Sequence, residues 1–181
     1  MTSILDCKIL VDLESCVKFI VYINTVDSSD NIIGSVDRHD ALSAGVNFRV
    51  VHIFLFNNTG QLLIQQIQQG KRHSGYWGSS VAGYVQFGES YDDAAIRRVA
   101  EELSLSSEVE FLAKSTMPEG AGVKFISLYK GTVDSRIKPN PNEISAIKFL
   151  FPSEISSEIQ SGIRLYTPTF LHIFQNMNWR S

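Results

Sequence analysis

Cysteine is scarce in this sequence: Cys7 and Cys16 are the only two among 181 residues. They lie nine positions apart with no further cysteine to pair with, so we interpret them as ordinary thiols and not as a disulfide framework. No run approaches the roughly 20 consecutive apolar residues that a membrane-spanning helix needs. The first residues also lack the basic stretch and the long apolar core of a signal peptide. We therefore expect a cytoplasmic protein.

Excess charge of one sign is also missing. The 16 lysines and arginines nearly balance the 19 acidic residues, for a net charge of −3. This balance gives no sign of binding to nucleic-acid backbones or to anionic membrane surfaces. A hydrophobic fraction of 44% is ordinary for a globular protein, and we find no internal repeat or linker. We expect one domain over residues 1–181. The sequence leaves monomer and homodimer open.

The pattern of apolar residues and turns predicts an α/β fold with a mixed sheet and helices on its faces. Asn57–Gly60 is expected to join a hairpin, and a loop is expected at 117–122. Residues 1–45 form an N-terminal extension with a second hairpin, of which 1–18 show no clear pattern. The predicted strands are 19–26, 32–36, 50–56, 61–67, 108–112, 123–133 and 143–150. Besides the helix after Ser90, helices are predicted at 153–162 and 167–177.

The stretch 83–105 holds the most informative pattern. A strand and a tight turn at Gly88 lead into a helix with Ser90 as N-cap and Asp93 completing a capping box. On this helix Ile96, Val99 and Leu103 fall on one predicted apolar face. The loop before it is expected to bring Glu89 towards Glu101 and Glu102, beside the carbonyl of Gly83. Such oxygen ligands suit Mg²⁺ or Mn²⁺.

This stretch resembles the Nudix box, whose pattern is Gly-x5-Glu-x7-Arg-Glu-aliphatic-x-Glu-Glu-x-Gly-aliphatic. Two positions depart from the pattern: Arg98 replaces the first Glu of the Arg-Glu pair, and Ser104 replaces Gly. The matching residues are Gly83, Glu89, Arg97, Val99, Glu101, Glu102 and Leu105. Seven matches at nine fixed positions make a specific signal. The resemblance implies an α/β/α sandwich; the alternative is an amphipathic helix with two Arg–Glu surface pairs.

The resemblance implies metal-dependent hydrolysis of a nucleoside diphosphate linked to another group, a small-molecule substrate. The metal would be held by Glu101, Glu102 and the Gly83 carbonyl, with Glu89 in support. Arg97 would orient a neighbouring carboxylate. In the polar loop 68–78, Lys71 or Arg72 would neutralise the phosphates. Trp77 in this loop is expected in the core.

Arg98 raises the question of which group activates the water. An arginine can neither bind a metal nor act as a base, so it either turns aside to Glu102 or a substrate phosphate, or weakens the metal site. The replacement base would be Glu119, in a loop that could close over substrate, or Glu143, in that order. The second candidate function is a non-catalytic Nudix module that binds a nucleotide or another phosphorylated ligand.

Beyond the box, residues 24–171 resemble the branch that contains isopentenyl-diphosphate isomerase. The similarity lies in Leu-Phe-Asn-x-x-Gly-x-Leu-Leu, in Lys before Gly-x-Trp, in Ser-Val-x-Gly and in Ile-Arg-Arg. The isomerase needs a Cys where this chain has Ala82 and a metal-binding His where it has Tyr84. Its remaining metal ligands would fall near Ala41, Phe48, Gly122 and Lys124. We therefore do not expect isomerase activity.

Overall fold

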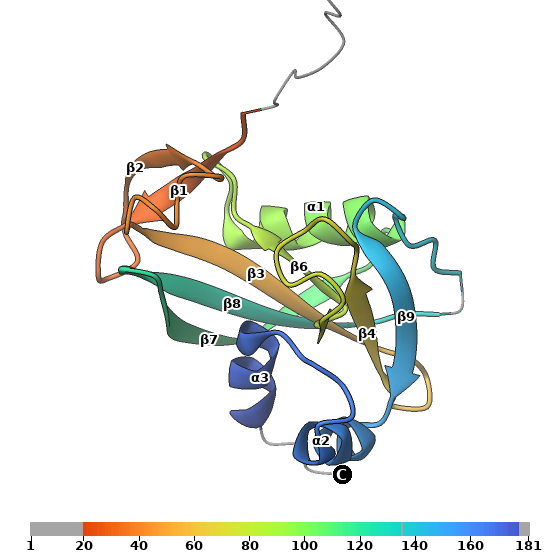
Figure 1. Cartoon of the computed structure of the whole chain (residues 1–181). Helices are drawn as coiled ribbons and strands as arrows, with labels where there is room; N and C mark the ends of the chain where they lie inside the picture. The colour runs from red at the N-terminus through yellow and green to blue at the C-terminus, as the bar shows by residue number, and fades with distance from the viewer. Residues whose placement is uncertain (1–19, 135, 178–181) are drawn as a thin grey trace, which may run out of the picture.

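The computed structural model describes residues 20–134 and 136–177. Cys7 and Cys16, which we expect to be ordinary thiols, lie outside this part of the chain. The elements, all except β5 labelled in Figure 1, are β1 (Tyr22–Val26), β2 (Ile32–Asp37), β3 (Asn47–Phe56), β4 (Leu62–Ile67), β5 (Trp77–Gly78), β6 (Val81–Tyr84), α1 (Tyr91–Leu103), β7 (Val109–Glu119), β8 (Gly122–Thr132), β9 (Ile144–Leu150), α2 (Pro152–Ser161) and α3 (Pro168–Gln175).

Strand β3 is the centre of a mixed nine-stranded sheet (Figure 1). On one edge it pairs in parallel with β8 from Phe48 to Phe56. Along its other edge it pairs in turn with β1, β6 and β4, all antiparallel. The long run of branched and aromatic residues suits this position, because a central strand is buried on both faces. The predicted mixed sheet is confirmed.

Helices cover both faces of the sheet, as the alternation of side chains along β3 requires. Phe48, Val50 and Phe54 belong to a core cluster that includes residues of α2 and α3. Val51 and Ile53, which point to the opposite face, belong to a second cluster with residues of α1. Figure 1 shows α1 on one side of the sheet and α2 with α3 on the other. The predicted α/β/α arrangement is confirmed.

The hairpin expected between 50–56 and 61–67 is only partly right. The turn forms, with the amide of Gly60 donating to the carbonyl of Asn57 at 3.0 Å. The two strands then share the single pair Phe56–Leu62 and separate. Strand β4 pairs instead with β9 along its whole length. The reason is competition, since β6 occupies the edge of β3 that a longer hairpin would need.

The loop expected at 117–122 is wrong. Strands β7 and β8 continue to a two-residue turn at Gly120–Ala121, where Gly120 takes a φ of 62°. Pro118 misled the prediction, although proline is tolerated on an edge strand such as β7. Gly122 is required by close approach, because a Cβ there would lie 2.2 Å from the carbonyl oxygen of Val46. Glu119 therefore ends a paired strand and is not carried by a closing loop.

Helix α1 begins as predicted, with Ser90 and Asp93 forming a reciprocal capping box. The predicted apolar face is wrong at one position: Ile96 is 57% exposed, whereas Val99 and Leu103 are buried. The small side chains of Ala94 and Ala95 let the helix approach the sheet, so the buried stripe is centred on them. The buried face of α1 is therefore rotated about the helix axis relative to the predicted apolar face. Ile96 lies at the edge of this buried face, and Glu102 points inwards.

No helix in the part of the chain described is long and apolar enough to span a membrane.

The end of α1 generates a prediction about stability. Ser104 caps the helix at a φ of 54°, a left-handed conformation that glycine adopts without strain. We expect Ser104→Gly to raise the free energy of unfolding by about 1 kcal/mol, measured by urea titration. Ser106→Gly is the matched control, because Ser106 does not have a positive φ and should only lose stability. A loss in both variants would contradict the assignment of strain at Ser104.

Candidate functional site

A cleft of about 870 Å³ opens where β3, β4, β6 and α1 meet the loops at 70–73 and 143. Six of its lining side chains are cationic and three are acidic. The cations are Arg38, Lys71, Arg72, Arg97, Arg98 and Lys124, and the acids are Glu101, Glu102 and Glu143. A concave surface with excess positive charge attracts anionic ligands such as phosphates. The structure thus places Lys71 and Arg72 in one cleft with five box-region residues: Gly83, Arg97, Arg98, Glu101 and Glu102.

Arg97 joins two of the box carboxylates. Its Nε and Nη2 donate to Glu89 at 2.5 and 2.9 Å, and its Nη1 donates to Glu101 at 3.1 Å. Glu89 also accepts from the backbone amide of Gln86 at 2.9 Å. Burial alone would raise the pKa of Glu89, but Arg97 and this amide hold the pKa below its usual value. Arg97 therefore orients Glu89, the position that precedes the helix.

Arg98 joins the other carboxylates. Its Nη1 donates to Glu101 at 2.7 Å, its Nη2 donates to Glu102, and its Nε donates to the carbonyl of Ala82 at 3.2 Å. Of the two open possibilities for Arg98, the structure shows the one in which it pairs with Glu102. The side chain also lies across Gly83, where an added Cβ would meet its Nε at 2.4 Å.

Glu102 is the most buried acid of the cleft, with a side chain only 2% exposed. Burial raises its pKa, and the charge of Arg98 opposes that rise. Gln65 on β4 donates to its second oxygen at 2.7 Å. We did not predict Gln65, although a signal was present: it is polar and follows the apolar run Leu62–Ile64 on a strand.

Glu143 lies close to this group. Its carboxylate pairs with the ammonium of Lys71 at 2.6 Å, and its charge acts on Arg98 and Glu102. The loop that carries Lys71 is tied to the segment before β9, since the amide of Gln68 donates to the carbonyl of Glu143 at 3.0 Å.

Glu119 does not itself line the cleft, but it pairs with two cations that do. It pairs with Arg72 at 2.5 Å and with Lys124 at 2.6 Å. Burial would raise the pKa of Glu119, but these two cations hold it below its usual value. Lys124 also donates to Thr169 at 2.7 Å. We did not predict Lys124 as a site residue; its signal was a charge within the apolar strand 123–133.

His52 faces the same region from β3. Its Nδ1 lies 2.8 Å from the hydroxyl of Ser79. Burial, and then the charge of Lys124, lower its pKa to about 3, so His52 is neutral at physiological pH. Beside it the rings of Phe48 and Tyr84 lie 5.5 Å apart. Trp77, which was expected in the core, is 7% exposed.

The expected geometry of the metal site needs correction. Glu89, Glu101 and Glu102 do not meet at one point, because the guanidinium groups of Arg97 and Arg98 lie between them. Among residues 20–134 and 136–177, no three His, Cys, Asp or Glu side chains lie close enough to hold a metal. The donor types suit Mg²⁺ or Mn²⁺, but the place next to Glu101 and Glu102 is filled by a guanidinium.

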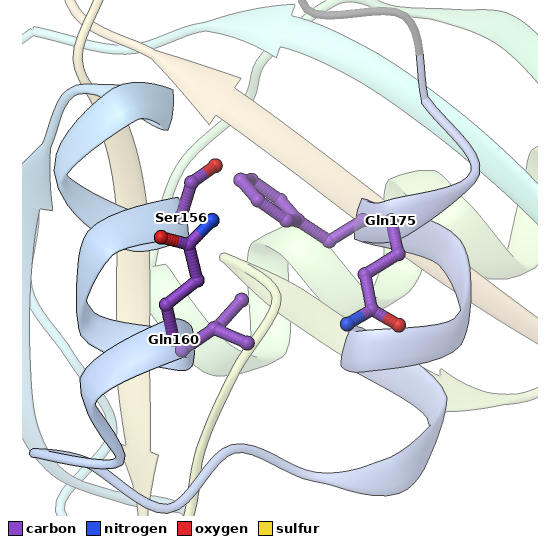
Figure 2. A pocket seen from close by; sticks show the side chains of 5 residues that line it. Ser156, Gln160 and Gln175 are labelled. Carbon is purple, nitrogen blue, oxygen red and sulfur yellow. The ribbon is translucent and has the colours of Figure 1, made fainter.

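A second cavity, of about 240 Å³, lies between α2 and α3 (Figure 2). Ser156 and Gln160 of α2 face Gln175 of α3 across it. Its lining contains no charged group, so it offers no chemistry comparable to that of the larger cleft.

Comparison with known proteins places these features in context. The family model described as the NUDIX domain matches residues 46–170. The isopentenyl-diphosphate Delta-isomerase of Serratia proteamaculans is 30% identical over 84% of this chain and 88% of its own. An uncharacterized Nudix hydrolase of Nostoc, all7351, is 32% identical over 77% of this chain and 86% of its own. The crystal structure of DR0079 from Deinococcus radiodurans has a TM-score of 0.78 and 28% identity, covering 88% of this chain and 99% of its own.

His52 predicts how stability depends on pH. Its pKa of about 3 in the folded protein lies below the value of 6.5 for the free side chain. As pH falls, His52 therefore takes up a proton in the unfolded chain before it does so in the folded protein. The contribution of neutral His52 to the free energy of unfolding is therefore fully present above pH 6.5. It is lost as pH falls towards 3, by about 1.4 kcal/mol per pH unit at most. Urea unfolding at pH 7 and pH 5 should show a smaller loss in His52→Gln than in wild type. Equal losses would contradict the buried neutral histidine.

Proposed function

Because the chain belongs to the Nudix family, we propose that its cleft hydrolyses the diphosphate of a nucleoside diphosphate linked to another group. The observation that carries this proposal is that one cleft holds the ion pair of Lys71 with Glu143 and, beside it, Arg98 with the box carboxylates Glu101 and Glu102. Cations next to a carboxylate can hold phosphate oxygens and direct a water at phosphorus. Arg72, at the mouth of the same cleft, would contact a more distant phosphate or the attached group.

Glu101 and Glu102 would hold Mg²⁺ or Mn²⁺, with Glu89 and the Gly83 carbonyl in support. This assignment requires Arg98 to leave the two carboxylates, since one site does not hold both cations. A divalent cation bound there supplies positive charge to the phosphate oxygens. Arg97 keeps Glu89 and Glu101 in place throughout, because its contacts with them do not involve Arg98.

Glu143 is the better candidate for the group that activates water. It acts on Arg98 and Glu102 through its charge and contacts only Lys71 among the cations. Glu119, which the sequence ranked first, is engaged by both Arg72 and Lys124, and this pairing lowers its basicity. It also lies at the end of a paired strand and not in a loop that could close over substrate. We therefore reverse the order of the two candidates.

The second candidate function is a module that binds a nucleotide or phosphorylated ligand without turnover. The observation in its favour is the pairing of Arg98 with Glu101 and Glu102, which neutralises the carboxylates that hydrolysis would use. A phosphate-release screen decides between the two. It would cover nucleotide sugars, ADP-ribose, dinucleotides and nucleoside triphosphates with Mg²⁺ or Mn²⁺. Turnover of a diphosphate supports the hydrolase, and ligand binding without any turnover supports the module.

We further propose that the chain forms one domain, since hairpin β1–β2 joins the same sheet as β3. Its partner would be a small molecule in the cytoplasm, with neither nucleic acid nor a membrane involved.

Glu143→Gln should lower kcat by about 10²–10⁴, the usual contribution of a positioned base. The matched control is Glu119→Gln, which removes the same charge from the other group in the cleft and should change kcat much less. Both variants would be assayed on the best substrate of the screen. Wild-type kcat in Glu143→Gln would contradict the assignment, and a large loss in Glu119→Gln alone would restore the original order.

We predict no isomerase activity. The isomerase resemblance places metal ligands at Phe48, Tyr84 and Lys124, where this chain has a ring contact and an ammonium group. It also has Ala82 in place of the catalytic Cys. Purified protein incubated with isopentenyl diphosphate and Mg²⁺ or Mn²⁺ should yield no dimethylallyl isomer by mass-resolved chromatography. Any enzyme-dependent isomer formation would overturn this prediction.

A further inference from the structure

Arg98 lies at the most acidic point of the cleft floor, and each of its nitrogen atoms has a partner. Two nitrogens donate to Glu101 and Glu102, and the third donates to the carbonyl of Ala82. Only 15% of the side chain is exposed. One positive charge is therefore shared by two adjacent carboxylates, of which Glu101 is 43% exposed and Glu102 only 2%. Such pairing is strongest where water is excluded, which is at Glu102.

The backbone beneath Arg98 is shaped to receive it. An added Cβ at Gly83 would lie 2.4 Å from Nε, 2.6 Å from Cδ and 2.9 Å from Cγ of Arg98. Only glycine leaves room for the side chain to cross β6 at this point. The position of Arg98 is thus built into the fold by two elements, β6 and α1, and is not a chance surface contact.

Beside Glu102, the side chain of Gln65 has an oxygen atom that accepts no hydrogen bond from the residues described. Gln65 is 8% exposed and donates to Glu102, yet its Oε1 has no hydrogen-bond partner among the residues described. A buried acceptor without a partner is unfavourable, and native proteins rarely keep one without a ligand or water. Gln65 also lines the cleft. This oxygen therefore points to an occupant that the protein itself does not supply.

We propose that Arg98 closes the carboxylate pair of the free protein against divalent cations, and that a phosphate-bearing ligand releases it. Arg98 and a divalent cation compete for the same oxygens of Glu101 and Glu102. A guanidinium pairs well with a phosphate, through two parallel hydrogen bonds, so a diphosphate in the cleft offers Arg98 another partner. Once Arg98 turns, Glu102 loses its ion-pair partner and Glu101 keeps only Arg97. The two carboxylates can then bind a cation, while Gln65 keeps Glu102 in place.

This inference rests on the proposed function, because it takes the ligand to carry a diphosphate. Its consequence is that cation and ligand binding are coupled through one side chain, and such coupling is reciprocal. Deleting Arg98 should open the carboxylate pair even when no ligand is present. If metal and phosphate were coupled only through direct contact with each other, deleting Arg98 would not change the metal affinity of the ligand-free protein.

The test measures Mn²⁺ affinity by electron paramagnetic resonance of free Mn²⁺, without ligand. We expect Arg98→Met to bind Mn²⁺ at least about tenfold more tightly than wild type, within the usual range of such couplings. Arg136→Met is the matched control: it removes the same charge from a side chain that is 86% exposed and pairs with Asp134. It should bind Mn²⁺ as wild type does. Equal affinity in wild type and Arg98→Met would overturn the proposal.

A second arm adds the α,β-methylene analogue of ADP, with Mn²⁺ binding to the analogue alone subtracted. The analogue should tighten Mn²⁺ binding more in wild type than in Arg98→Met, and an equal gain would overturn the proposal. If Arg98→Met does not fold, Arg98→Lys replaces it. An ammonium cannot span both carboxylates and the Ala82 carbonyl, so this variant should bind Mn²⁺ more tightly than wild type. Unchanged affinity would count against the proposal.

The outcome is separable from that of the hydrolase proposal. Tight Mn²⁺ binding in Arg98→Met, with no turnover in the screen, would support the role of Arg98 and reject hydrolysis by the wild type. Turnover in the screen, with Mn²⁺ affinity independent of Arg98, would support hydrolysis and reject the role of Arg98.

Discussion

The buried carboxylate of Glu102 is the constraint on which the cleft depends. A side chain that is 2% exposed cannot keep a negative charge without compensation, and removing one partner of such a pair costs about 3–5 kcal/mol. Arg98 supplies the charge from the preceding helical turn, and Gln65 supplies a hydrogen bond from the sheet. Because Glu102 is buried where it lines the cleft, its ionised form needs a cation beside it.

The sheet explains why that cation sits where a ligand can reach it. Strand β6 pairs with β3 beneath α1, and Gly83 brings the Arg98 side chain close to the main chain. On the other side of β3, strand β8 runs parallel and carries Lys124 into the same cleft. The result is one concavity with two groups of charged residues. Arginines lie with carboxylates at α1, and Lys124 lies near the start of β8 with Arg72, both paired with Glu119.

The sequence predicted the parts of this arrangement that local rules determine. The capping box at Ser90, the helix start at Thr167 and the buried run in β3 follow from hydrogen bonding and periodicity within a few residues. It failed where distant segments compete, as when β6 took the edge of β3 that the expected hairpin with β4 needed. It also missed Gln65, since a polar residue within a strand gives no indication of which charge it will meet.

Two differences from the patterns of the related families change the charge of the cleft in the same direction. Arg98 stands where the Nudix box has a glutamate, and Lys124 stands near a glutamate of the isomerase pattern. Each replaces a negative charge by a positive one within the cleft, and each cation pairs with a carboxylate of this chain, Glu102 or Glu119. Positive charge in this cleft is therefore supplied by side chains of the chain itself. A diphosphate, the ligand that we propose, would meet these cations already in place, and it would change how their charge is shared between the protein's carboxylates and its own oxygens.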